Sequence, residues 1–159
     1  MLTLDFFVRL VIEAGAAAII GVAFGMVFTV PQRFLSYIAV VAACTRVCRT
    51  ILFTAGMEIT FATFISCALM SLYFVYLAPK LKAPRPIFTV TCIIALIPGI
   101  DAYEALLAII QVLDPTSMDM PNPVFVMFHH LMRAFAIILA IVLGIAIPPL
   151  FFYRYRKNV

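Results

Sequence analysis

Nine ionisable residues lie within long apolar stretches of this sequence, where charge is rare. A charged side chain at the centre of a membrane helix is unfavourable by roughly 2.5–3.5 kcal/mol on insertion scales, so such residues usually pair or serve a function. The nine are Arg9, Glu13, Arg46, Arg49, Asp101, Glu104, His129, His130 and Arg133. Their number favours a functional polar cavity in the membrane. Pairing that only holds the helices together is the alternative.

The spacing of these residues places several of them on shared helix faces. Arg9 and Glu13 are four residues apart and can pair locally. Arg46 and Arg49 are three apart on one face, so they need partners from elsewhere. Glu13 and His130 are candidates for a proton relay, since a carboxylate and an imidazole can both exchange protons.

Pro98 and Gly99 interrupt the apolar stretch that carries Asp101 and Glu104. Proline removes a backbone donor and clashes with the preceding turn, and glycine adds conformational freedom. Together they predict a kink or break at membrane depth, where irregular backbone persists only if protein or a wet cavity covers it. Broken helices near the midplane often build transporter sites, and a simple bend is the alternative.

The elements that must position these residues are membrane helices. The chain is 66% hydrophobic and only 11% charged, with a mean hydropathy of +1.19, whereas soluble domains hold about 25% charged residues. The apolar runs are too long and too continuous for barrel strands. Five stretches have about the length that a membrane span needs: residues 6–28, 34–54, 59–77, 86–112 and 124–153. We expect an all-α integral membrane protein in which residues 1–159 form a single membrane domain.

The charges between these spans alternate in sign. The bases are Arg33, Lys80, Lys82, Arg85, Arg154, Arg156 and Lys157, and the acids are Asp5, Glu58, Asp114 and Asp119. Because bases favour the cytoplasmic side, the N-terminus is predicted to lie outside and the C-terminus in the cytoplasm. Pro148 and Pro149 are expected to mark the end of the last span.

The depth of each charged residue in the membrane, counted along its helix, then indicates which of these residues lie at the same level. At about 1.5 Å per residue, Arg46 and Arg49 lie roughly 18–22 Å above the inner edge. Asp101 and Glu104 lie roughly 22–27 Å above it, so an arginine–acid pair between the second and fourth spans is predicted. Arg133 and Glu13 fall in the same middle-to-outer slab.

Small residues four apart predict close helix contacts. They occur at Ala17, Gly21 and Gly25 and again at Ala136, Ala140 and Gly144. Packing within the chain and contact with another subunit are both consistent with this pattern.

Several functional classes are disfavoured. The four cysteines Cys44, Cys48, Cys67 and Cys92 lie in apolar spans, without the additional ligands of a zinc site, and are expected to pack. No enzyme motif or cofactor motif is present. A net charge of +4 is too small and dispersed to indicate nucleic-acid binding.

Particular motifs carry a resemblance to a known family. Phe28-Thr29-Val30-Pro31 closes the first span, Arg49 lies in the second, and Phe88-Thr89-Val90 opens a span containing Ile97-Pro98-Gly99-x3-Tyr103. In these motifs the chain resembles the threonine/serine exporter (ThrE) family, specifically the small subunit of its two-component form. The resemblance covers nearly the whole chain.

The resemblance implies export of small metabolites across the bacterial inner membrane. Family substrates include threonine and serine, and small dicarboxylates such as succinate for some members. It also implies a larger membrane subunit as partner, which single-chain members carry fused ahead of this region. Pro98, Gly99, Tyr103 and Arg49 carry over by motif. Asp101 and Glu104 depart from the pattern.

The leading hypothesis is therefore a transporter subunit in the lipid bilayer that binds a small-molecule substrate. The residues expected to contact substrate are Arg46, Arg49, Asp101, Tyr103, Glu104 and Arg133. The acids either pair with the arginines or bind a substrate ammonium or a proton. A non-transporting scaffold subunit is the alternative function, and a homo-oligomer is the alternative assembly.

Overall fold

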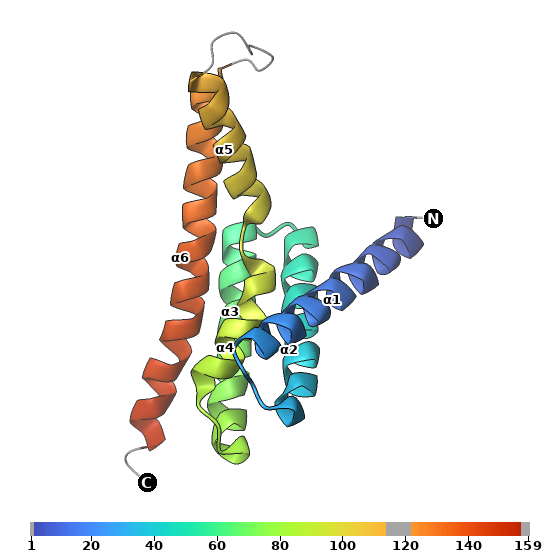
Figure 1. Ribbon diagram of the computed structural model, residues 1–159, viewed down its shortest axis with the longest axis vertical. Helices are drawn as coiled ribbons and strands as arrows, with labels where there is room; N and C mark the ends of the chain where they lie inside the picture. The colour runs from blue at the N-terminus through green and yellow to red at the C-terminus, as the bar shows by residue number, and fades with distance from the viewer. Residues whose placement is uncertain (1, 114–121, 157–159) are drawn as a thin grey trace. The chain divides into compact units, whose positions relative to one another are not determined.

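The computed structural model describes residues 2–113 and 122–156, and this part of the chain is helical, with no strand (Figure 1). The helices are α1 (Leu2–Val27), α2 (Gln32–Thr54), α3 (Ile59–Leu81), α4 (Arg85–Ile93), the 3₁₀ turn η1 (Ile94–Leu96), α5 (Gly99–Leu113) and α6 (Pro123–Arg156). The all-α prediction is confirmed. The predicted acids Asp114 and Asp119 and the base Lys157 lie outside the described residues.

Length and apolarity make this a multi-pass membrane protein. Four helices, α1, α2, α3 and α6, are long and apolar enough to cross a membrane. The number of spans is five if α4 and α5 together make one membrane crossing. The predicted orientation of the termini stays a prediction.

The fourth predicted span is divided where the sequence placed Pro98 and Gly99. After α4 and η1, residues 97 and 98 are not helical, and α5 begins at Gly99. The Gly99 N–H donates to the Ile97 carbonyl at 2.8 Å, and the Ala102 N–H donates to the Pro98 carbonyl at 3.0 Å. A Cβ at Gly99 would meet nothing within 4 Å, so space does not require glycine here. The direction of α5 relative to α4, and with it the kink, stays a prediction.

Two helices contain prolines near their carboxyl-terminal ends. α6 contains both Pro148 and Pro149, and α3 contains Pro79 in its last turn. The expectation that Pro148 and Pro149 end the last helix was wrong. Proline fixes φ near the helical value and removes a single donor, so a helix can continue past it with a lost hydrogen bond, and membrane helices tolerate this.

The chain divides into two compact units, residues 1–96 with 140–159, and residues 97–139. The first unit has an aromatic core from three helices. Phe88 of α4 stacks on Phe74 of α3 with ring centroids 5.1 Å apart, and meets Phe34 of α2 edge-on at 5.4 Å. All three rings are buried. This core holds α2, α3 and α4 together and thereby fixes the start of the divided span.

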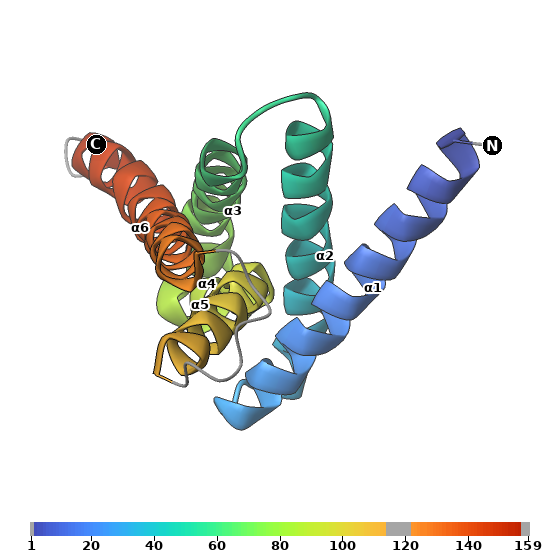
Figure 2. The ribbon, with the colours of Figure 1, turned by 90° about the horizontal axis from the view of Figure 1, so that it is seen from above.

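Small residues bring neighbouring helices of the first unit into close contact. A Cβ at Gly21 would lie 3.0 Å from the Ala42 Cβ, and one at Gly25 would lie 2.8 Å from Leu35 Cδ2. α1 therefore packs closely on α2 in its carboxyl-terminal half, while the amino-terminal end of α1 leads away from α2 (Figures 1 and 2). A Cβ at Gly144 would lie 2.8 Å from the Cys67 Cβ. These three glycines serve packing within the chain.

Candidate functional site

A first group of intramembrane polar residues, here called the arginine cluster, joins α1, α2 and η1. It consists of Arg9, Glu13, Arg46, Arg49 and Thr50. Glu13 is its centre. Its Oε1 lies 3.2 Å from Arg9 Nε, and its Oε2 lies 3.2 Å from Arg46 Nε and accepts a hydrogen bond from Thr50 Oγ1 at 2.7 Å. One carboxylate thus compensates charge from two helices.

The two arginines of α2 also donate to backbone carbonyls at the end of the divided helix. Arg46 Nη1 lies 3.3 Å from the Ala95 carbonyl oxygen, and Arg49 Nη1 lies 3.0 Å from that of Leu96. Both carbonyls belong to η1, the last turn before the break. The arginines are therefore held by their own chain next to Pro98.

The second unit contains its own charged group, here called the Asp101 cluster. Asp101 lies in the first turn of α5, and its side chain is only 13% exposed. Its Oδ1 lies 3.1 Å from His130 Nδ1 and 3.8 Å from Arg133 Nη1, both on α6. An ionised carboxylate can only accept hydrogen bonds, so His130 donates to Asp101 from Nδ1.

Two other predicted site residues lie beside this cluster on α5 without joining it. The Tyr103 residue is 59% exposed. Glu104 is half-buried, and within residues 2–113 and 122–156 the structure gives it no ion pair or hydrogen bond. Glu104 is therefore a half-buried acid without a charged partner among the described residues.

The contact predicted between residues close in sequence is present, whereas contacts between residues far apart in sequence were missed. The local pair Arg9–Glu13 is confirmed. The contacts of Glu13 with Arg46 and Thr50 were missed, although Thr50 lies one turn after Arg46 on the same face of α2. His130 and Arg133 were not predicted to meet Asp101. The predicted pairing of an α2 arginine with an acid of the fourth span stays a prediction.

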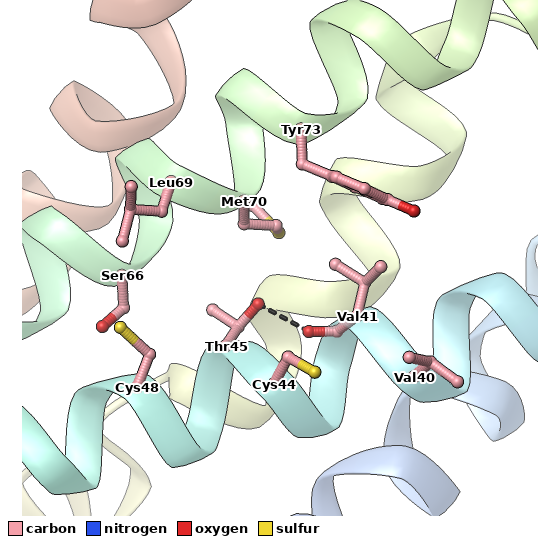
Figure 3. Close-up of a pocket in the computed structure, with 9 residues that line it drawn as sticks. All are labelled: Val40, Val41, Cys44, Thr45, Cys48, Ser66, Leu69, Met70 and Tyr73. Carbon is pink, nitrogen blue, oxygen red and sulfur yellow. Dashed lines mark hydrogen bonds between the residues drawn. The ribbon is translucent and has the colours of Figure 1, made fainter.

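An apolar pocket of about 370 Å³ lies between α2 and α3 and was not predicted (Figure 3). Its lining comprises Val40, Val41, Cys44, Thr45, Cys48, Ser66, Leu69, Met70 and Tyr73. The Thr45 hydroxyl donates to the Val41 carbonyl at 2.6 Å and is thereby satisfied within its own helix. None of the nine described lining residues is charged.

The cysteines divide between this pocket and the interior. Cys67 and Cys92 are buried, as the packing prediction required. Cys44 is exposed and Cys48 half-buried, and both line the pocket. Across the described residues, no group of three or more His, Cys, Asp or Glu side chains is arranged to hold a metal ion.

Comparison with known proteins identifies the family of this chain. A family model described as "Threonine/Serine exporter, ThrE" matches residues 13–151. The chain belongs to the threonine/serine exporter family. The matched range includes Glu13, the α2 arginines and the whole Asp101 cluster, and it confirms the resemblance to the threonine/serine exporter family.

A curated relative and the known structures complete the comparison. A Haemophilus influenzae protein, described only as an uncharacterized protein, is 36% identical over 158 residues. These cover 97% of this chain and 51% of that relative. The chain thus spans about half the length of this curated relative. No solved structure matches. The threonine/serine exporter family is a transporter family, which indirectly favours a transporter over an enzyme.

Proposed function

We propose that this chain is a subunit of a bacterial inner-membrane exporter of small metabolites, of the threonine/serine type. The observation that carries the proposal is the family match over residues 13–151 of a multi-pass helical chain. Transport through lipid needs polar groups at membrane depth, and the arginine and Asp101 clusters supply both signs of charge.

The Asp101 cluster and the neighbouring Glu104 support an amphoteric or anionic substrate. Arg133 offers a guanidinium to a substrate carboxylate, and Glu104 and Asp101 offer carboxylates to an ammonium. Binding of threonine or serine requires protein groups of both charge signs, whereas binding of succinate requires cationic groups only. Glu104, which has no ion pair among the described residues, therefore favours the amino acids. Tyr103, Arg46 and Arg49 complete the set of residues on which transport is proposed to depend.

The proposal includes a larger membrane subunit as partner. This chain corresponds to about half of the relative's length, so a second polypeptide can supply the remainder. A homo-oligomer of this chain alone is the competing assembly. His130 and Glu13 remain the proposed proton-exchanging residues.

An export assay tests this function. Cells that lack their own exporters would express this chain, its larger subunit, or both, and efflux of threonine, serine and succinate would be followed together. We expect efflux of one solute only with both chains, and a decrease of at least several-fold with Arg49→Ala at an unchanged membrane level. Arg9→Ala is the matched control, because the Arg9 side chain is 76% exposed.

Each other outcome changes the proposal in a defined way. Efflux with this chain alone would replace the two-chain assembly by a homo-oligomer. Full transport by Arg49→Ala would remove that residue from the transport machinery. If no combination exports any solute although both chains reach the membrane, the transporter role fails. The scaffold alternative is favoured if the larger subunit also disappears from the membrane without this chain.

A further inference from the structure

The end of the divided helix has carbonyl groups that a continuous helix would satisfy. In an α-helix each carbonyl accepts from the N–H four residues later. The Ala95 carbonyl would therefore use the N–H of Gly99, but that N–H donates to Ile97 at 2.8 Å. Pro98 has no N–H to offer at all. The last carbonyls of η1 consequently need donors from elsewhere, as at any helix C-terminus.

The two α2 arginines supply those donors. Arg46 Nη1 is 3.3 Å from the Ala95 oxygen, and Arg49 Nη1 is 3.0 Å from the Leu96 oxygen. A cation at a helix C-terminus also interacts favourably with the helix dipole. Two successive carbonyl oxygens thus each accept a hydrogen bond from a guanidinium group. The two arginines that donate these bonds are three residues apart on one face of α2.

Arg46 is itself held in place by α1. Glu13 Oε2 accepts from Arg46 Nε at 3.2 Å and from Thr50 Oγ1 at 2.7 Å. The Arg46 side chain is 30% exposed and the Glu13 side chain 19%. The charge of Arg46 is therefore compensated by a carboxylate from a different helix, which leaves its Nη1 directed at η1.

We propose that Arg46 and Arg49 are positioning residues that cap the helix interrupted at Pro98, with Glu13 orienting Arg46. Transport depends on these arginines through the shape of the break, and not through direct contact with substrate. This inference rests on the proposed function only for its kinetic test. Its stability test requires no transport.

A double-mutant cycle tests the proposal in the purified membrane protein. It combines a substitution of the capping arginine with substitutions at the helix break, and Tm is measured for each variant. Arg49→Met removes the donor, and Pro98→Ala with Gly99→Ala introduces the strongest helix former at the two break positions. We expect Arg49→Met to lower Tm by on the order of 5 °C. In the Pro98→Ala/Gly99→Ala background the loss should be much smaller, because backbone N–H groups then reach the carbonyls.

Arg9→Met is the matched control for this cycle. Arg9 contacts Glu13, but the structure shows no bond from it to a carbonyl of the break. Its substitution should change Tm equally in both backgrounds. Equal losses for Arg49→Met in both backgrounds would overturn the capping role.

Transport kinetics separate positioning from substrate binding. Arg49→Lys keeps a flexible donor that can reach the Leu96 carbonyl. For a positioning residue we expect kcat to decrease several-fold with KM nearly unchanged, and Arg49→Lys to retain more activity than Arg49→Met. A rise in KM of tenfold or more at unchanged kcat would show that Arg49 binds the substrate carboxylate, and would overturn the proposal.

Discussion

Glu13 and Asp101 show how single acidic residues organise charge at membrane depth. Glu13 accepts from Arg9, Arg46 and Thr50, whereas Asp101 accepts from His130 and lies near Arg133. Each acid thus has two basic partners, and removing it would leave cations uncompensated. Removing one partner of a buried pair is much more harmful than replacing both.

Asp101→Ala tests this argument at the residue scale. The substitution should lower the free energy of unfolding by about 3 kcal/mol, because Arg133 loses its carboxylate and His130 its acceptor. Asp101→Asn should lower the free energy of unfolding by less, since the amide oxygen can still accept a hydrogen bond from His130. Thermal or denaturant unfolding in detergent measures both.

Glu104→Ala is the control for Asp101→Ala. Glu104 is on the same helix and half-buried, with no ion pair in the described part of the chain. Its loss should change stability by less than about 1 kcal/mol. Similar losses for both acids would show that the Asp101 cluster contributes no specific stability.

At the scale of elements, close contact between helices depends on glycine. α6 approaches α3 so closely at Gly144 that an added Cβ would lie 2.8 Å from both the Cys67 Cβ and the Phe64 carbonyl oxygen. Ser71 nearby donates to the Ile145 carbonyl at 2.9 Å. Small residues let helix backbones pack in this way where lipid supplies no hydrophobic driving force.

Gly144→Ala should therefore destabilise the protein by about 1–3 kcal/mol, because a fixed Cβ and a backbone oxygen cannot move aside easily. Gly15→Ala is the matched control on α1, where an added Cβ meets nothing within 4 Å. It should be neutral or stabilising by up to about 1 kcal/mol. Tm values of the two variants in the same detergent make the comparison. A Gly144→Ala variant as stable as the parent would contradict the close α3–α6 contact.

At the scale of the whole molecule, the chain exposes an apolar surface that only lipid or other membrane helices can cover. Exposed large apolar side chains occur along α1, α2, α3, α5 and α6. The basic residues Arg33, Lys80, Lys82 and Arg85 lie in or beside the connections from α1 to α2 and from α3 to α4. We predict that they face the cytoplasm and so orient this surface in the membrane. The acidic Glu58 lies in the connection from α2 to α3.

Cysteine labelling tests the orientation. A membrane-impermeant maleimide added to intact spheroplasts should label Glu58→Cys and leave Lys82→Cys unlabelled until the membrane is opened. The unaltered chain, which carries four native cysteines, provides the background. Labelling of Lys82→Cys in intact spheroplasts would reverse the predicted orientation.

Local chemistry was sufficient for several features of this protein. Continuous apolar runs predicted the helices, since backbone groups in lipid must bond within their own segment. The missing N–H of Pro98 marked the place where the fourth helix is divided. The spacing of four residues predicted the Arg9–Glu13 pair. Each of these depends on residues of a single continuous segment of the chain.

Only the tertiary structure decided which distant residues meet. Arg46 contacts Glu13 and Ala95 across separations of 33 and 49 residues, and His130 contacts Asp101 across 29. Apolar periodicity in a membrane helix gives little information about its neighbours, because lipid and protein are equally apolar. The close approach of α1 to α2 through Gly21 and Gly25 selects Glu13 as the partner of Arg46. Charge and spacing alone left that choice open, because the packing of backbones determines which charges lie within hydrogen-bond distance.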